Sequence, residues 1–191
     1  MKTARDFANA LNFAITMHEG QVRKGNGKPY INHPIAVMAN VISVKKSDNI
    51  FLLGMAALLH DVVEDCGVSL ESIAIAFGYD VASLVEELTL DKKKYKTIGK
   101  KEYVAQEALK MSSYALCIKL CDRLNNIMDM EGMKDSFQKR YIVDTLYLLN
   151  TIEKRKLSPT HKKLITKIKN ECFIASIKLR HRKLRKKHKK V

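Results

Sequence analysis

Apolar residues recur along this chain at intervals of three and four, the spacing that places side chains on one face of a helix. Phe7, Ala10 and Ala14 show the pattern in the first segment. Alternating segments rich in β-branched and aromatic residues and bounded by turns are missing, so we predict no strands. The pattern predicts an all-α bundle with helices over residues 3–24, 34–44, 48–65, 69–77, 81–88, 101–110, 112–130, 136–153 and 158–179.

Glycine, proline and capping residues set the predicted helix ends. Two glycines and a proline within residues 25–29 end the first helix, because they continue a helix only at a cost. Pro34 and Pro159 suit the first turn of a helix, and Gly67 suits the position just after one. The lysine-rich stretch 91–101 predicts an exposed loop.

The composition is that of an ordinary globular domain, with 46% hydrophobic and 29% charged residues among 191. The longest apolar run covers residues 50–59 and is too short to span a bilayer. Asp6, Asn9 and Asn12 interrupt the N-terminal segment where a secretory signal needs an apolar core. We therefore expect a soluble cytoplasmic protein with no membrane partner and with reduced cysteines. Cys117 and Cys121 share a helix face and resemble half a zinc site, but with no second Cys or His pair nearby we expect them to be buried as small apolar side chains.

Positive charge is concentrated at the C-terminal end. Residues 1–151 hold 19 Lys and Arg against 18 Asp and Glu, whereas residues 152–191 hold 16 against 2. This division predicts a near-neutral domain over 1–154, followed by a basic helix and tail over 155–191. Two interpretations of residues 178–191 remain open: contact with RNA, the ribosome or another anionic partner, or a solvated, frayed end.

Four ionisable residues lie together at the end of an apolar helical segment: His60, Asp61, Glu64 and Asp65. On a continuous helix Asp61 neighbours both Glu64 and Asp65, and His60 neighbours Glu64. Groups placed this way repel and desolvate one another unless positive charge is present, which a divalent metal would supply. The alternative is that the helix end emerges into water and the charges are solvated, and the segment alone does not decide between the two.

His33 and Asp122 favour the metal site over the solvated helix end. His33 precedes a predicted helix start, and Asp122 lies within an otherwise apolar helix. Each, taken alone, is more typical of a hydrogen-bonded core residue than of a ligand. Together with the His60-Asp61 pair they form a set of two histidines and two aspartates. Such mixed nitrogen and oxygen ligation suits manganese, iron or magnesium with open water positions.

The order of these residues resembles the metal signature of the HD superfamily of metal-dependent phosphohydrolases. Longer phrases narrow the resemblance. QVRK, PYINHP, ALLHDVVED and KLCDRLNN occur in order and at characteristic spacing. Over residues 4–150 the chain resembles the guanosine tetraphosphate (ppGpp) hydrolase domain of the RelA/SpoT family, and in particular the stand-alone small alarmone hydrolases.

The resemblance implies an HD-domain helical bundle that removes the 3′-pyrophosphate of ppGpp or pppGpp to leave GDP or GTP. It implies that Glu64 and Asp65 hold and deprotonate the attacking water. The implied manganese (Mn2+) ligands are His33, His60, Asp61 and Asp122. The residues expected to contact the nucleotide or offset its charge are Arg23, Lys24, Asn126, Lys139 and Tyr141.

Other substrates remain open. Asp129 stands where the long bifunctional enzymes tend to carry a neutral hydroxyl residue, and it would repel a polyphosphate if it faced the pocket. The alternatives are an HD-family phosphohydrolase of another nucleotide (ppApp, NADPH or a dNTP) and an RNA- or ribosome-associated protein that uses the basic tail. Since little more than a helix follows residue 150, we expect a hydrolase without synthetase or regulatory domains.

Overall fold

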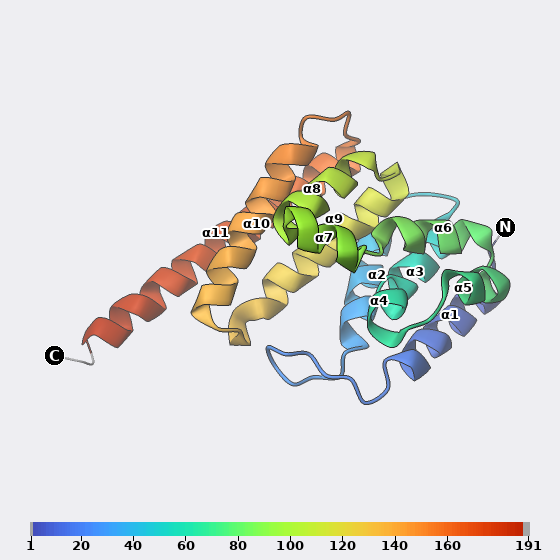
Figure 1. The fold of residues 1–191 in the computed structure, drawn as a ribbon, viewed down its shortest axis with the longest axis horizontal. Helices are drawn as coiled ribbons and strands as arrows, with labels where there is room; N and C mark the ends of the chain where they lie inside the picture. Colours follow the sequence, from blue (N-terminus) through green and yellow to red (C-terminus); the bar gives the residue numbers. More distant parts are fainter. Residues whose placement is uncertain (1, 189–191) are drawn as a thin grey trace.

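The computed structural model describes residues 2–188, which form a bundle of α-helices (Figure 1). One isolated antiparallel bridge, between Val22 and Pro29, is the only β-type pairing in those residues. The prediction of an all-α fold is therefore confirmed. The helices are α1 (Ala4–Met17), α2 (Asn32–Val44), α3 (Ile50–Leu59), α4 (Val62–Cys66), α5 (Leu70–Phe77), α6 (Tyr79–Leu88), α7 (Lys92–Ile98), α8 (Lys100–Lys110), α9 (Ser113–Asp129), the 3-10 turn η1 (Met130–Gly132), α10 (Asp135–Ile152) and α11 (Pro159–His188).

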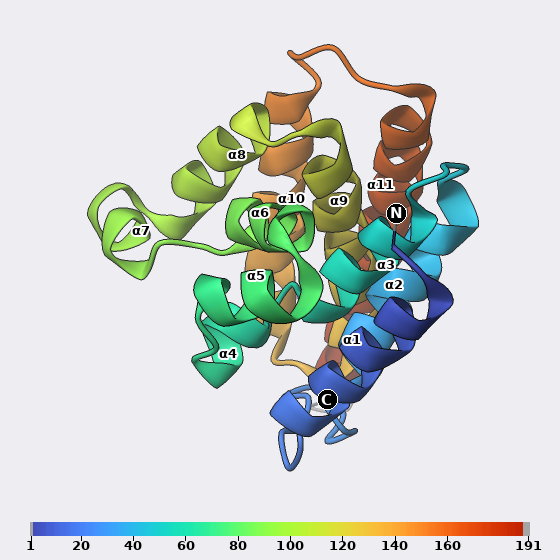
Figure 2. The ribbon, with the colours of Figure 1, turned by 90° about the vertical axis from the view of Figure 1, so that its right-hand side faces the viewer.

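Helix α9 lies at the centre of the bundle. It packs against α2, α3, α6, α10 and α11, and Figure 2 shows it flanked by α10 on one side and α11 on the other. Leu116, Ile118, Leu120 and Leu124 are fully buried along it. Because apolar side chains surround this helix on most sides, any charged residue on it must find a partner inside the fold.

The N-terminal helices build a second apolar cluster beside this core. It joins α1 with α3, α4, α5 and α6. Thr3 and Asp6 cap α1 reciprocally, which satisfies backbone N–H groups at its start. Gly54 lets α1 approach α3 closely, since a Cβ at that position would lie 2.6 Å from Cε2 of Phe7. This packing supports the N-terminal end of the segment that contains His60.

The prediction of one continuous helix over 48–65 is wrong. The chain turns at His60 and Asp61, so that α3 ends at Leu59 and α4 begins at Val62. The cause is local: the His60 ring donates from Nδ1 to the carbonyl of Ala57, which in an unbroken helix would receive the N–H of Asp61. The break places both residues of the pair at a bend rather than on a helix face.

The first helix is also shorter than predicted. It ends at Met17 rather than near Lys24, and Gly20 takes a left-handed conformation (φ 73°) just beyond it. The chain then forms a short arm whose two sides pair through Arg23 N–H to Lys28 O and Tyr30 N–H to Gln21 O. Arg23 and Lys24 therefore lie on a loop and not on a helix.

Two further predictions of secondary structure are wrong. The stretch 91–101 contains α7, because the Asp91 carboxylate accepts from the N–H groups of Lys93 and Lys94, and lysine itself is a good helix former. The last helix runs to His188 rather than to Leu179, and its C-terminal end extends beyond the rest of the bundle (Figure 1). Residues 189–191 of the predicted tail lie outside the described residues.

Helix α11 packs along α9 through a row of buried apolar residues. Leu164, Ile168, Cys172 and Leu179 are at most 4% exposed and belong to the same cluster as the core of α9. The boundary at residue 154 stays a prediction, and the packing makes α11 a structural part of the bundle. No helix in residues 2–188 combines the length and apolar character needed to cross a bilayer.

His161 makes the stability of this packing depend on pH. It is 2% exposed, with Nε2 2.9 Å from the carbonyl oxygen of Ser113 and Nδ1 accepting from the N–H of Ser158. Burial lowers the pKa of His161 below its ordinary value of 6.5, and the charges of Lys45 and Arg155 act in the same direction. The folded chain therefore disfavours a proton that the unfolded chain accepts.

We expect the free energy of unfolding to be unaffected by this group well above pH 6.5 and to fall as the pH drops below it, by at most about 1.4 kcal/mol per pH unit. His161→Gln should flatten that fall, as measured by urea unfolding at several pH values. The matched control is His181→Gln, because His181 is exposed on the same helix. Parallel pH profiles for wild type and His161→Gln would contradict the assignment.

Candidate active site

Three buried side chains from different parts of the chain meet at the centre of the bundle. His33 comes from the start of α2, His60 from the bend after α3, and Asp122 from the middle of α9. One ligand atom from each lies within 4.8 Å of the others. The Nε2 atoms of His33 and His60 lie 3.3 and 4.0 Å from Oδ1 of Asp122. The sequence prediction that these residues converge is supported by this geometry.

Both imidazoles are oriented by their outer nitrogen. Nδ1 of His33 lies 2.6 Å from the amide oxygen of Asn125, and Nδ1 of His60 lies 2.8 Å from the carbonyl oxygen of Ala57. Because both partners are acceptors, Nδ1 carries the proton in each neutral ring. The lone pair on Nε2 then faces the centre of the triad, as in metal-ligating histidines held by an oxygen acceptor.

Asp61 lies beside the triad. Its Oδ2 is 3.0 Å from Nε2 of His60 and 3.6 Å from Nε2 of His33. The hydroxyl of Tyr30 donates to the same oxygen at 2.7 Å. Burial, together with the negative charge of Asp61, raises the pKa of Tyr30 above its usual range, so Tyr30 remains a donor at neutral pH. Asp61 is thus held toward the two imidazoles, and its role as a fourth ligand stays a prediction.

The carboxylates of Asp61 and Asp122 dominate the electrostatics around His60. Burial alone would lower the pKa of His60, but Asp61 and Asp122 outweigh it and raise the pKa to about 9. Burial would raise the pKa of Asp122, but Lys119, with Nζ 3.4 Å from Oδ2, and the two imidazoles hold it well below its usual value. Asp122, which is buried, and Asp61, which is partly buried, therefore stay ionised. Protonated His60 and Lys119 offset their charge when no metal is bound, and a divalent cation can take the place of the His60 proton.

A divalent metal fits these residues. Nε2 of His60 is buried, and its close polar neighbours include carboxylate oxygens of Asp61 and Asp122, 3.0 and 4.0 Å away. In a neutral ring with the proton on Nδ1, the lone pair on Nε2 faces these oxygens with no donor between them, which is costly unless a cation binds there. The donor set combines imidazole nitrogen with carboxylate oxygen, which suits metals that retain open positions. Nε2 of His60 and the carboxylates of Asp61 and Asp122 face the same space, and a divalent cation there would interact favourably with all three.

Two more carboxylates lie shortly after the His60-Asp61 pair in the sequence. Glu64 and Asp65 lie on α4 and line the same cleft as Asp61 and Asp122. The backbone N–H of Leu90 donates to Oε1 of Glu64 and fixes its side chain. Oε2 of Glu64 has no hydrogen-bond partner among residues 2–188 and so is available to accept a proton. The predicted acid–base pair is therefore next to the metal set.

A cleft of about 550 Å³ opens above this centre, large enough for a nucleotide. Four of the five residues predicted to contact substrate line it: Arg23, Lys24, Asn126 and Tyr141. Lys139 does not. It is exposed on α10, where Phe137 and Tyr141 share the face toward the cleft at a spacing of four and Lys139 lies on another face.

Asn126 connects the metal set to the nucleotide loop. Its amide nitrogen donates to Oδ1 of Asp122, while its amide oxygen accepts from Nη2 of Arg23 at 2.7 Å. Arg23 also donates from Nε to Oδ2 of Asp129 at 3.0 Å, and Asn26 donates to Oδ1 of Asp129 at 2.6 Å. Asp129 therefore faces the cleft, but its charge is paired with Arg23.

Comparisons with known proteins identify the family of the chain. Residues 10–156 match the family model described as HD domain. The chain is 41% identical over 123 residues to the guanosine-3′,5′-bis(diphosphate) 3′-pyrophosphohydrolase MESH1 of Xenopus tropicalis, an alignment that covers 64% of this chain and 68% of that protein. The chain belongs to the HD-domain family, in the MESH1 group.

Other relatives support the same placement. The human MESH1 is 38% identical over 128 residues, with 66% of this chain and 70% of that protein covered. The bifunctional (p)ppGpp synthase/hydrolase SpoT of Escherichia coli K12 is 37% identical over 145 residues, which are 72% of this chain and only 20% of that longer protein. A solved structure described as a metazoan ortholog of SpoT that hydrolyzes ppGpp matches with a TM-score of 0.73 and 31% identity, covering 88% of this chain and 96% of that one. The resemblance found in the sequence is thereby confirmed.

Two cations of this HD domain were missed by the sequence reasoning. Lys119 and Arg123 are each 8% exposed, line the cleft and flank Asp122 on α9. The guanidinium of Arg123 lies 4.7 Å from the centre of the Tyr141 ring, and burial raises the pKa of Tyr141 to about 12. The sequence did contain a signal for them: Lys119 and Arg123, like Asp122, are charged residues within an otherwise apolar helix.

We expect a divalent cation to stabilise the wild-type chain through the His33, His60 and Asp122 set. At a cation concentration a hundred times the dissociation constant, the stabilisation is about 2.7 kcal/mol, or roughly 5–10 °C in Tm for a chain of this size. Asp122→Asn should abolish the shift, and Asp48→Asn, a change at an exposed carboxylate, should retain it. Calorimetry with and without manganese, and metal analysis of the folded variants, provide the measurement. A full shift in Asp122→Asn would contradict the ligand assignment.

Proposed function

We propose that this chain is a manganese-dependent hydrolase that removes the 3′-pyrophosphate from ppGpp and pppGpp and leaves GDP and GTP. The single observation that carries the proposal is that one cleft holds both the buried metal set with its adjacent carboxylates and a group of basic residues. The relatives' activity on guanosine-3′,5′-bis(diphosphate) supports the choice of substrate.

The cleft combines carboxylates and cations, as a substrate with several phosphate groups requires. Carboxylates surround the metal set at one end. The cationic residues Arg23, Lys24 and Arg123 line the same cleft, and Lys119 lies beside the metal set, where it pairs with Asp122. Arginine offers paired donors to phosphate oxygens and lysine a point charge. These cations would offset the charge of a nucleotide whose scissile bond lies next to the metal set.

The chain's own carboxylates would move the proton. In the reaction, the oxygen of a water attacks the phosphorus bonded to the ribose 3′-oxygen, and the bond between that phosphorus and the 3′-oxygen breaks. The attacked group leaves as pyrophosphate, and the 3′-oxygen keeps the electron pair and takes up a proton to become the 3′-hydroxyl of GDP or GTP. We assign Glu64, with its free Oε2, as the base that accepts the water proton, and Asp65 as its neighbour that orients the water. When bound, a divalent cation supplies positive charge that acidifies water and offsets the charge of the phosphoryl oxygens.

Asp129 does not disfavour this substrate in the way the sequence suggests. An unpaired carboxylate in the cleft would repel phosphate, but both oxygens of Asp129 already accept hydrogen bonds, from Arg23 and Asn26. Turnover of ppApp, NADPH and dNTPs beside ppGpp tests the remaining HD-family alternatives directly. An RNA or other anionic partner for residues 178–191 stays a prediction.

Incubation of the manganese-loaded protein with ppGpp should yield GDP and pyrophosphate, resolved by ion-exchange chromatography. Glu64→Gln should lower kcat by about 10²- to 10⁴-fold, because it removes the base, while it keeps the manganese-dependent rise in Tm. The matched control is Glu71→Gln, at an exposed position on α5, which should keep wild-type turnover.

One outcome would contradict the assignment of the base, and another would contradict the choice of substrate. Near-normal turnover by Glu64→Gln would show that the base is another residue, while the hydrolase proposal would stand. Formation of no GDP by metal-loaded wild type, together with turnover of a different nucleotide, would replace ppGpp as the substrate.

A further inference from the structure

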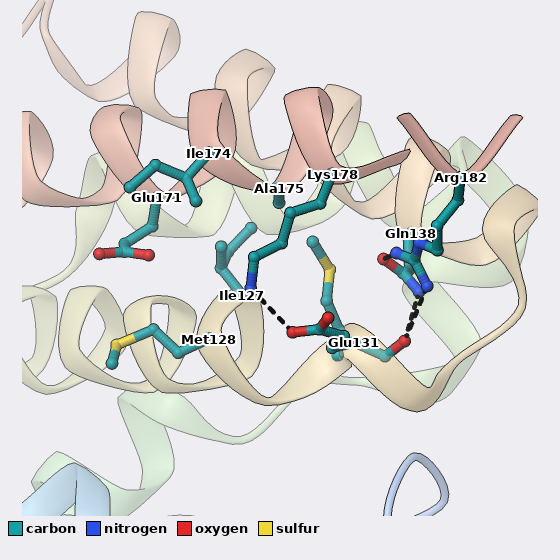
Figure 3. A pocket seen from close by; sticks show the side chains of 10 residues that line it. Ile127, Met128, Glu131, Gln138, Glu171, Ile174, Ala175, Lys178 and Arg182 are labelled. Atoms are coloured by element: carbon teal, nitrogen blue, oxygen red, sulfur yellow. Dashed lines mark hydrogen bonds and ion pairs between the residues drawn. The ribbon is translucent and has the colours of Figure 1, made fainter. Parts of the chain in front are cut away.

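The C-terminal helix is fastened to the turn that follows α9. Figure 3 shows Arg182 and Lys178 of α11 reaching toward Glu131 in η1. Arg182 donates from Nη1 to the carbonyl oxygen of Glu131 at 3.2 Å and from Nη2 to the amide oxygen of Gln138 at 2.9 Å. Lys178 pairs with the Glu131 carboxylate at 2.9 Å. Two side chains of α11 thus hold one short turn.

Gln138 makes this joint rigid. It is 1% exposed, and its amide nitrogen donates to the carbonyl oxygens of Glu131 and Met133 at 2.9 and 2.7 Å. Since a buried amide is costly unless its donors and acceptor are paired, the three bonds fix both ends of the turn. The cavity between these residues is only about 40 Å³, so the contact is a joint rather than a site for a ligand.

The other side of the same turn touches the nucleotide loop. A Cβ at Gly132 would lie 1.8 Å from the carbonyl oxygen of Gly25, and a Cβ at Gly25 would lie 3.3 Å from the carbonyl oxygen of Asp129. The two backbones therefore meet with no room for a side chain between them. A displacement of η1 toward Gly25 therefore also displaces the loop that carries Arg23 and Lys24.

We propose that Arg182 is a positioning residue that, through Gln138 and the η1 turn, sets the placement of the Arg23–Lys24 loop and hence nucleotide affinity. The path runs from α11 to η1 by hydrogen bonds, from Gly132 to Gly25 by backbone contact, and from there along the loop. None of these joint residues reaches the metal set. The proposal uses the proposed function for its kinetic readout.

Arg182→Met should raise KM for ppGpp about five-fold, because loss of the net contribution of one or two hydrogen bonds loosens the loop. It should leave kcat within about two-fold, because His33, His60 and Asp122 keep their contacts with Asn125, Ala57 and Lys119, which lie outside the loop. Arg182→Lys should recover part of the affinity, since lysine can still donate to the Glu131 carbonyl. Gly132→Ala should raise KM in the same way from the other side of the turn, because the added methyl group displaces Gly25.

Arg180→Met is the matched control. It removes the same charge from the same helix, and Arg180 is exposed with no hydrogen bond or ion pair within the described part of the chain. It should leave KM unchanged. An equal rise in KM for Arg180→Met and Arg182→Met would assign the effect to overall charge and overturn the proposal.

A second readout does not depend on catalysis. The chain contains no tryptophan, so Lys28→Trp, at an exposed position on the loop, introduces a single fluorescent reporter. In that background Arg182→Met should lower the fluorescence anisotropy of the introduced tryptophan, and Arg180→Met should not. Unchanged anisotropy together with unchanged KM in a folded Arg182→Met protein would overturn the proposal. If wild type hydrolyses no ppGpp, the proposed function fails and the anisotropy comparison still decides the coupling.

Discussion

The buried carboxylate of Asp122 is the constraint on which the rest of the site depends. It lies on the central helix of the bundle, where an unpaired charge would be strongly unfavourable, and two imidazoles and Lys119 surround it. Satisfying this one group draws α2 and the bend after α3 toward α9. Asn126, one turn further along, extends the same network to Arg23. The metal set and the nucleotide loop are therefore organised from one face of one helix.

Sequence periodicity was sufficient for most of the fold, because burial follows apolar spacing directly. It failed where a side chain competed with the backbone. At His60 the imidazole takes a helix carbonyl, and at Asp91 a carboxylate starts a helix in a lysine-rich stretch that pattern alone assigns to a loop. Helix α1 ends before Gly20, which takes a left-handed conformation. The sequence analysis placed the helix end at Gly25 instead, because two glycines and a proline follow one another there. Local hydrogen bonding decided each of these cases.

The site was predictable to the extent that its chemistry lies in short phrases. His33, His60 and Asp122 were identified from residue type and order, and the structure brings them together. Lys119 and Arg123 were missed because cations beside a motif are usually solvated, and only the packing of α9 shows them to be buried. Lys139 was predicted to contact the nucleotide because of its charge, and charge does not indicate which face of the helix a residue occupies. Contacts that rely on backbone proximity, such as Gly25 against Gly132, leave no mark in a pattern of polarity.

The hydrogen bond from His33 to Asn125 spans 92 residues, and that from Arg23 to Asp129 spans 106. The helices up to α6 have an apolar cluster of their own, so a nascent chain can bury them before α9 leaves the ribosome. Such an intermediate contains both imidazoles and neither the carboxylate of Asp122 nor the clamp on Arg23. Competence for chemistry therefore requires α9 to dock against the N-terminal helices, because that step supplies Asp122 and the residues that pair with Arg23.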